Sequence, residues 1–393
     1  MMNVASFFKI NLRKALRFPD VWKPFYDFFY YTGRRPSKHA LLSYRVNGVW
    51  TQSRTTWSAI GDVHTILQAL SELGYRTDII DYADTAFVPR RRYDLFIGHA
   101  GDNYAHIVKH LSPDTVKIFY PMYAYWKFQN EEEEKRITEV CTRRGVTLHA
   151  ERAIHTSDDY ALEHADGVIL LSNDRGRRTY PRPERIGILD SASYGGDKCL
   201  DLAVKNFEAA RNNFLFIAGS GNVHKRLDLL LEAFARMPDK HLYLCTKLED
   251  DFRAAYAREL FETPNIHYIG HIRLYTPQFF ELMRTCNYLM YTSCSEGSPG
   301  AVIDAMFQGL IPLVSAGAHI DVDDLGQVIE PCTVERIMAT AQEVSGHDAS
   351  WYAERAHHVQ QEAQRRFGED VYIAKLKQHI QSIVRQKRYA AST

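Results

Sequence analysis

The chain shows no excess of charge of either sign and no long apolar run. Its 393 residues contain 48 basic and 48 acidic side chains, so the formal net charge at pH 7 is zero. A balanced chain gives no indication of a nucleic-acid partner, because binding to a polyanion requires a basic surface. No window reaches the ~18 uninterrupted apolar residues that a transmembrane helix needs. We therefore expect neither a nucleic-acid-binding protein nor a membrane-spanning one.

Paired cysteines are also lacking. The six cysteines are scattered along the chain, and no two of them form a C-x-x-C pair. This pattern suggests neither disulfides nor a structural zinc site, so we expect reduced thiols in a cytoplasmic protein. The composition is otherwise ordinary for a globular protein, with 45 % hydrophobic and 24 % charged residues. The length suggests two domains or one large one.

Residues 1–38 differ from the rest of the chain in being basic and aromatic. The segment contains eight lysines and arginines and two aspartates, which gives it a charge of +6 (8 − 2). Apolar residues at helical spacing between Phe8 and Leu16 are followed by the aromatic stretch WKPFYDFFYY. Such a segment would suit the anionic inner face of a membrane, with the protein bound peripherally. The alternative is an arm that packs on its own domain and leaves its basic side chains in solvent.

Short apolar runs alternate with helical patterns in both halves of the chain. The first half contains HALLSYRV, YDLFIGH, VKIFYPM and ADGVILLS, and from residue 212 the pattern restarts with NFLFIAG, KHLYLCT, NYLMYTS and IPLVS. Continuous apolar strands between helices are typical of parallel sheets covered on both faces. We therefore predict an α/β fold with two Rossmann-like, doubly wound domains facing across a cleft. The predicted segments are the arm 1–38, an N-terminal acceptor domain 39–200, a C-terminal donor domain 201–368, and a C-terminal helix 369–393 that packs back on the N-terminal domain.

The loop after NFLFIAG brings two cations to the start of a helix. It runs from Gly219 to Lys225 and Arg226, and the following residues have helical spacing. Cations are unfavourable at a helix N-terminus unless an anion is bound there, and a diphosphate would suit. His224 and Arg226 on either side of the lysine exclude a P-loop, and the absence of a third glycine argues against a dinucleotide fingerprint. The alternative is a plain turn with exposed basic residues.

A second candidate is SEGSPGAVIDAMFQGLIPLVS at 295–315, where two acids flank a tight turn. Ser298 and Pro299 have the character of an N-cap and a first helical residue. Glu296 then lies just outside the helix and Asp304 within it, roughly 8 Å from its first turn. Two carboxylates at this separation can each hold a pair of hydroxyl groups of one extended ligand, such as a nucleotide sugar. The alternative is one capping acid and one exposed acid.

Together these stretches resemble the motifs of retaining GT-B glycosyltransferases of the family 4 type, the glycosyl transferases group 1. SEGSPGAVIDAMFQGLIPLVS is similar to the family's E-x7-E signature, and FIAGSGNVHKRLDLLLEAF is similar to its G-R-x4-K-G motif. NIHYIGHIRLYTPQFFELMRTCNYLMYTSCSEG resembles the strand, helix and strand that lead into the first glutamate. The resemblance covers about residues 212–318, and the N-terminal half resembles the family mainly in layout.

The resemblance implies a role for each motif residue. Lys225 would bind the donor diphosphate, Glu296 would contact the donor sugar and Asp304 would bind the ribose. Lys225 and Glu296 are thereby the candidate catalytic residues. Further donor contacts are expected from the same loops and from a turn of the N-terminal domain. These residues are Gly61 (in a turn before the helix DVHTILQAL), Gly219, Arg226, Gly297, Ser298, Pro299 and Gly300.

The chain departs from the family pattern at three positions. Ser220 stands where the family has Arg, Arg226 where it has Gly, and Asp304 where it has the second Glu. Arg226 could supply the missing cation from another direction, and an aspartate can still bind a ribose. A catalytically silent homologue, which binds a nucleotide sugar or a partner glycosyltransferase, is therefore the alternative to an active enzyme.

The resemblance implies a hexosyltransferase that uses a nucleoside-diphosphate sugar as co-substrate and retains the anomeric configuration. No cofactor or metal is expected, because the D-x-D of DVDD at 321–324 follows the donor motif and is interpreted as a surface loop. The acceptor would be a glycan or a lipid-linked molecule of polysaccharide or glycolipid assembly, bordered by His99 and Tyr123. The acidic run EEEEK at 131–135 is interpreted as a solvated helix face.

Overall fold

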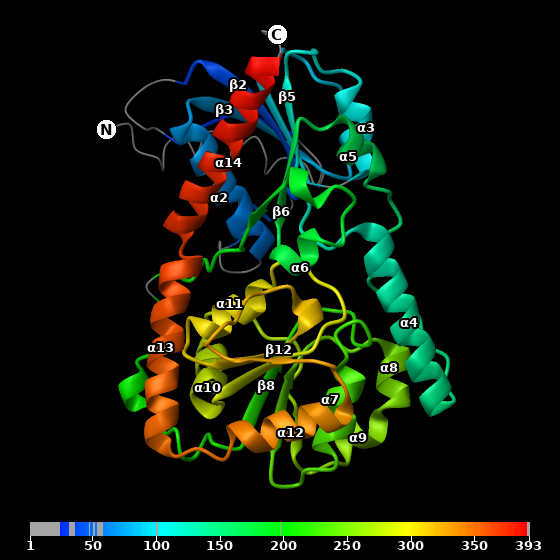
Figure 1. Cartoon of the computed structure of the whole chain (residues 1–393), viewed down its shortest axis with the longest axis vertical. Coiled ribbons are helices and arrows are strands. Elements are labelled where there is room, and N and C mark those ends of the chain that lie inside the picture. The colour runs from blue at the N-terminus through cyan, green and yellow to red at the C-terminus, as the bar shows by residue number, and fades with distance from the viewer. Residues whose placement is uncertain are drawn as a thin grey trace. The chain divides into compact units, whose positions relative to one another are not determined.

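The computed structural model describes residues 24–30, 36–46, 48–49, 52, 58–99, 101–196 and 198–390 (Figure 1). Most of the basic arm predicted for 1–38, including its helical spacing, lies outside the described residues. Within the described part of the chain, no helix combines the length and the apolar character that crossing a membrane requires.

The chain divides into two compact units. The first takes the chain up to Tyr120, Asp158–Ile169 and the chain from Ile373 on, and the second takes Pro121–Ser157 and Leu170–Tyr372. Each unit therefore combines segments that are far apart in the sequence. The boundaries predicted at residues 38, 200 and 368 stay a prediction.

The first sheet has the strand order β1-β3-β2-β4-β5-β6-β7. Strand β1 pairs antiparallel with β3, and the pairings from β3 through β2, β4 and β5 to β6 are parallel. Its strands are β1 Phe25–Phe28, β2 Lys38–Tyr44, β3 Tyr75–Asp81, β4 Leu95–Gly98, β5 Val116–Phe119, β6 Gly167–Leu171 and β7 Ile186–Leu189. The helices of this part are α2 Ser58–Glu72, α3 Gly101–Val108 and α5 Asp159–His164. Most side chains of the central strands are apolar and buried, as a sheet covered on both faces requires.

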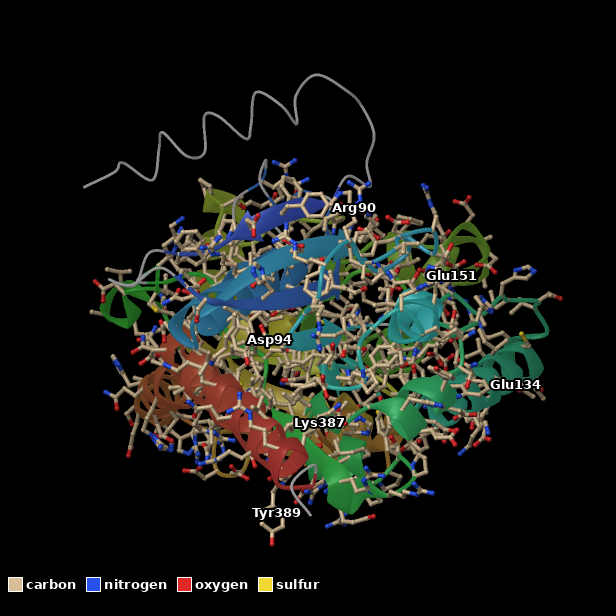
Figure 2. All side chains as sticks on the ribbon, turned by 90° about the horizontal axis from the view of Figure 1, so that it is seen from above. Arg90, Asp94, Glu134, Glu151, Lys387 and Tyr389 are labelled. Atoms are coloured by element: carbon tan, nitrogen blue, oxygen red, sulfur yellow. The ribbon has the colours of Figure 1, made fainter. Side chains whose placement is uncertain are left out.

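The last helix, α14 (Glu369–Ala390), contributes most of its length to the first unit. Lys377 pairs with Glu72 on α2 at 2.6 Å, and Lys387 donates to Asp166 at 2.8 Å. Figure 2 shows Lys387 on this helix and Tyr389 pointing away from the molecule near its end. The C-terminal segment is thus held to the first unit by ion pairs on two different elements.

The second sheet is parallel throughout, with the order β10-β9-β8-β11-β12-β13. Its strands are β8 Asn213–Ile217, β9 His241–Cys245, β10 Ile266–Tyr268, β11 Tyr288–Tyr291, β12 Ile311–Ser315 and β13 Gln327–Ile329. The helices of the second unit are α4 Trp126–Arg144, α6 Asp174–Arg177, α7 Leu227–Phe234, α8 Asp250–Ala255, α9 Ala257–Phe261, α10 Pro277–Thr285, α11 Gly300–Met306, α12 Val334–Val344 and α13 Ala349–Phe367. Helix α7 packs beside α12, and α11 packs beside α13 (Figure 1). The predicted α/β class with parallel, Rossmann-like sheets is confirmed.

Strand order reverses between β8 and β11, which are neighbours in the sheet although β9 and β10 lie between them in sequence. In open parallel sheets, ligands bind beyond the carboxyl ends of the strands at such a switch point. The loops after β8 and β11 are the two that carry the predicted motifs, so the topology places both motifs at the same end of the sheet.

Three local predictions are wrong. Helix α2 begins at Ser58, so Gly61 lies inside the helix and not in a turn before it. A single glycine costs a helix only about 1 kcal/mol, which the buried face of α2 readily outweighs. Helix α11 begins one residue later than expected, with Pro299 as its N-cap and Gly300 as its first residue. Glu133, in the run interpreted as a solvated face, is buried and accepts from the backbone N–H groups of two residues, Glu151 and Arg152.

Buried ions fix α4 to α7. Asp228 is completely buried, and its Oδ2 accepts from Arg136 at 2.5 Å and from Arg143 at 2.6 Å. Both arginines lie on α4, and Arg143 also reaches Glu232 at 3.1 Å. Removing one charged member of such a cluster leaves an uncompensated buried charge, so the cluster holds α4 in one position on the second unit.

Lys205 makes the stability of the fold depend on pH. Its buried ammonium donates to the carbonyl oxygens of Met283 at 2.9 Å and Cys286 at 2.5 Å, and burial lowers its pKa to about 7. The unfolded chain binds this proton up to about pH 10. Stability should therefore rise with pH above 7, by about 2 kcal/mol between pH 7 and 9 relative to a Lys205→Met variant. Urea unfolding of both proteins at pH 7, 8 and 9 measures this, and equal slopes with pH would contradict it.

Candidate functional site

Lys225 and Glu296, predicted from separate motifs, form an ion pair in the structure. Lys225 comes from the loop after β8 and Glu296 from the loop after β11. Their side chains are only 7 % and 12 % exposed. The Lys225 ammonium also donates to the Tyr291 hydroxyl at 2.8 Å, and the Ser293 hydroxyl donates to Glu296 Oε1 at 2.8 Å. These hydrogen bonds therefore fix the positions of both side chains at the switch point, between the loops after β8 and β11.

The two charges of this pair stabilise each other. Burial by itself would raise the pKa of Glu296, but the charge and hydrogen bond of Lys225, together with the nearby His224 and Arg152, outweigh it and lower the pKa to about 2. Burial likewise disfavours the lysine cation, yet the nearby Glu296 raises the pKa of Lys225. Both groups are ionised at neutral pH, so an anion that approaches Lys225 competes with Glu296 for the same ammonium.

Asp304 lies on α11 with only 6 % of its surface exposed. Its Oδ1 accepts hydrogen bonds from the Ser193 hydroxyl at 2.8 Å and the Tyr275 hydroxyl at 2.5 Å. Burial raises its pKa to about 6 despite these two donors. Tyr275 has a left-handed backbone with φ of 58°, which is uncommon for a bulky residue and is typical of a constrained functional segment. Asp304 is therefore a carboxylate that already binds hydroxyl groups.

The turn between the two acids fits closely against other backbone. A Cβ on Gly297 would overlap the carbonyl oxygen of Met122 and would lie 2.7 Å from that of Leu171. The Ser298 side chain accepts from the backbone N–H of Ser191 at 2.9 Å, and the Ser298 carbonyl accepts from the Ser191 hydroxyl at 2.9 Å. The turn is therefore fixed by contacts that a larger residue at 297 would break.

Two histidines in the site were not predicted as functional residues. Burial lowers the pKa of His224 to about 4, so the ring is neutral, and its Nε2 donates to the Ser295 carbonyl at 2.5 Å. His319, in the loop after β12, lies with its Nδ1 at 2.7 Å from the Glu296 carbonyl oxygen. Each histidine thus ties a neighbouring loop to the backbone around Glu296. Its place beside Lys225 in the sequence could have drawn attention to His224, whereas no sequence signal pointed to His319.

Other predicted site residues lie elsewhere. Gly219 is in the loop after β8, where its carbonyl accepts from the Thr246 hydroxyl at 2.6 Å. Arg226 follows Lys225 directly but lines a separate pocket, described below. Tyr123 belongs to the second unit, where its carbonyl accepts from the Tyr180 hydroxyl at 2.6 Å. Gly61 and His99 belong to the first unit, and burial lowers the pKa of His99 to about 4. The DVDD sequence at 321–324 is a loop, as predicted.

Comparison with known proteins identifies structures that share this fold. No protein-family model matches the chain, and no curated protein matches its sequence. Among solved structures, sucrose-phosphate synthase from Thermosynechococcus elongatus is similar with a TM-score of 0.61 and 14 % identity, covering 89 % of this chain and 99 % of that one. HepE from Anabaena, crystallised with UDP and glucose, has a TM-score of 0.57 and 12 % identity over 88 % of this chain and 100 % of its own.

A third similar structure is α,α-trehalose 6-phosphate synthase from Burkholderia multivorans, with a TM-score of 0.59, 11 % identity and coverage of 91 % and 100 %. These neighbours are GT-B glycosyltransferases. The fold of this chain is therefore the GT-B fold, in agreement with the resemblance of its motifs.

Proposed function

We propose that the protein is a retaining glycosyltransferase that moves a hexose from a nucleoside-diphosphate sugar to a glycan or lipid-linked acceptor. The observation that carries this proposal is the buried Lys225–Glu296 pair at the switch point of the second sheet. The crystallised complexes of HepE with UDP and with UDP-glucose support a nucleotide sugar as co-substrate. The motif resemblance supports retention and metal-independent chemistry.

Each site residue has a role in this proposal. Lys225 stabilises the negative charge that develops on the leaving diphosphate, in a site that is preorganised and largely dry. Glu296 holds hydroxyl groups of the donor sugar while positive charge develops on its ring. The leaving phosphate oxygen takes the acceptor's proton as the new glycosidic bond forms on the same face, so no separate base is required. Backbone N–H groups of Gly297, Ser298 and Gly300 offer further donors to the sugar and phosphate.

The ion pair also suggests an order of events. Donor diphosphate must draw Lys225 away from Glu296, which frees the carboxylate to accept sugar hydroxyl groups. Binding of the diphosphate and of the sugar are thereby coupled through one exchange of partners. A catalytically silent homologue remains the second candidate, since Lys225 and Asp304 both have partners within the protein.

Calorimetric titration with UDP, GDP, ADP and dTDP, followed by turnover of the matching nucleotide sugars, tests the proposal. One tightly bound diphosphate, together with release of that diphosphate from its sugar conjugate in the presence of acceptor extracts, is the expected result. Binding without release would favour the silent homologue. No binding of any diphosphate would overturn the proposal.

Asp304 should make nucleotide affinity depend on pH. We propose that its carboxylate accepts the ribose hydroxyls, in exchange for Ser193 or Tyr275. Because its pKa is about 6, nine-tenths of it is protonated at about pH 5, and affinity should fall about tenfold between pH 7.5 and 5. Asp304→Asn should bind the nucleotide more weakly at pH 7.5 and should lose this part of the pH dependence. The variant thereby separates titration of Asp304 from titration of the nucleotide itself. Parallel pH profiles of the two proteins would contradict the role.

The basic segment 1–38 is proposed to hold the protein on an anionic membrane surface, near lipid-linked acceptors. Its charge of +6 (8 − 2) supports this. Sedimentation with vesicles that contain anionic lipid, compared between the full chain and a chain lacking residues 1–38, tests it. Equal sedimentation of the two proteins would exclude this role.

A further inference from the structure

A second pocket, of about 660 Å³, lies in the second unit beside the proposed donor site. It is lined by residues at and just after the carboxyl ends of three parallel strands, β11, β12 and β13, such as Cys294 and Gly317, and by Arg226 directly before α7. Helices α4 and α6 contribute its walls. The volume is within the range of roughly 300–1,000 Å³ that is typical of small-molecule sites. Lys225, Glu296 and Asp304 are not among the lining residues, whereas Arg226, which was expected at the donor diphosphate from the sequence, is.

The arginines that line this pocket differ in whether they have an acidic partner. Arg175 is already paired with Glu330 at 3.0 Å. Among the residues that the structure describes, no carboxylate pairs with Arg178 or Arg226, and Arg226 bonds only the thiol of Cys332. Two guanidinium groups thus lie on one pocket without acidic partners, and their fork of donors matches phosphate and carboxylate oxygens. Arg178 is exposed and Arg226 is half-buried, so both can reach an anion that enters from solvent.

The walls that carry these groups are rigid. Arg226 and His319 both have left-handed backbones, with φ of 52° and 51°, and such conformations persist only where the surroundings impose them. A Cβ on Gly317 would overlap the backbone carbonyl of Cys294, so the loop after β12 lies directly on the loop after β11. Helix α4, which carries Phe128 and Glu132, is fixed to α7 by the buried ions described above. The pocket is therefore formed before any ligand enters.

We propose that this pocket binds a small sugar that carries one anionic group, a phosphate or a carboxylate. Arg178 and Arg226 bind the anionic group, the Glu132 carboxylate accepts sugar hydroxyls, and Phe128 provides an apolar face. The charges support this assignment: two unpaired arginines and one glutamate leave a single positive charge for the ligand (2 − 1 = +1). The inference goes beyond the proposed donor site and does not depend on it.

Titration with glucose 6-phosphate, glucuronate and uncharged glucose tests the proposal on the full chain. Both anionic sugars should bind and glucose should bind at least tenfold more weakly. Arg178→Gln and Arg226→Gln should each weaken binding by about 10- to 100-fold, since each removes a charged hydrogen bond. Arg185→Gln, which changes an exposed arginine outside the pocket, is the matched control and should bind normally. Equal thermal unfolding of the variants excludes a folding defect.

Two further measurements separate this pocket from the donor site. UDP should not displace glucose 6-phosphate, and a folded Glu296→Gln variant should still bind it. If UDP competes, or if neither arginine substitution weakens binding, the proposal is overturned. Incubation with a donor sugar then distinguishes the two sources of such a ligand: glycosylation of glucose 6-phosphate identifies an acceptor, and binding without glycosylation identifies an effector. Because none of the first titrations uses a donor, they remain informative even if no nucleotide binds.

Discussion

Replacing Lys225 by methionine should reduce donor turnover by about 10³-fold and destabilise the protein. The ammonium is the only cation that contacts Glu296 in the described residues, so the substitution removes the charge proposed to stabilise the leaving diphosphate. It also leaves a carboxylate that is 12 % exposed without a cationic partner. Breaking one side of a buried pair costs about 3–5 kcal/mol. Urea unfolding and steady-state turnover measure the two effects.

A double variant separates catalysis from stability. In Lys225→Met with Glu296→Gln no buried charge remains unpaired, so most of the stability should return while turnover stays low. If the double variant regains turnover, neither the Lys225 cation nor the Glu296 carboxylate is needed for the reaction and the proposed mechanism is wrong. If the single variant turns over donor normally, neither role stands.

The Lys225–Glu296 pair also determines how the free energy of unfolding changes in acid. The pKa of Glu296 is lowered to about 2 in the folded state, against an ordinary value of about 4.3 in the unfolded chain. Its contribution to stability is therefore complete above about pH 4.3 and is lost as pH falls toward 2. In Lys225→Met the pKa of Glu296 should rise, so this part of the acid slope should disappear. Unfolding at pH 2.5 to 5.5 measures it, and equal slopes would contradict the assignment.

The sequence was sufficient to predict the fold and to predict that the loops of Lys225 and Glu296 form one site, but not that the two side chains form an ion pair. Apolar strand runs are visible without structure, and parallel topology brings the loops after β8 and β11 to one end of the sheet. The partners of Asp304 could not be predicted in this way. Ser193 and Tyr275 lie 111 and 29 residues from it, and neither belongs to a motif with a spacing rule.

Patterns of charged residues predicted side-chain positions least well, because a pattern does not show which way a side chain points. Lys225 and Arg226 are adjacent in sequence, and both were assigned to one diphosphate. A left-handed φ at Arg226 turns the chain, and its guanidinium lines the second pocket. Glu133 belongs to a run of four glutamates, yet a helix turns each successive residue by about 100°. One member of the run therefore faces the interior, where backbone N–H groups of the loop at 151–152 compensate its burial.

Gly297→Ala should be among the most damaging single-methyl changes in the chain. The new Cβ would meet two backbone carbonyl oxygens, those of Met122 and Leu171, which cannot rotate away as a side chain can. Overpacking costs about 1–3 kcal/mol where side chains can yield, and with fixed backbone we expect about 3 kcal/mol. The turn must shift to relieve the contact, and it carries Glu296 and the N–H groups proposed to bind sugar and phosphate.

A displacement of about 1 Å at such a turn lowers turnover by about 10²-fold, so Gly297→Ala should lose activity even at temperatures where it is fully folded. Gly219→Ala is the matched control for stability, because its Cβ would meet no heavy atom within 4 Å. Its free energy of unfolding should stay within about 0.5 kcal/mol of wild type. Chemical unfolding of both variants, with turnover measured well below the transition, distinguishes steric displacement from a general intolerance of alanine. Normal turnover in a stable Gly297→Ala protein would mean that the turn can move without consequence, and the donor contacts assigned to 297–300 would then have to be withdrawn.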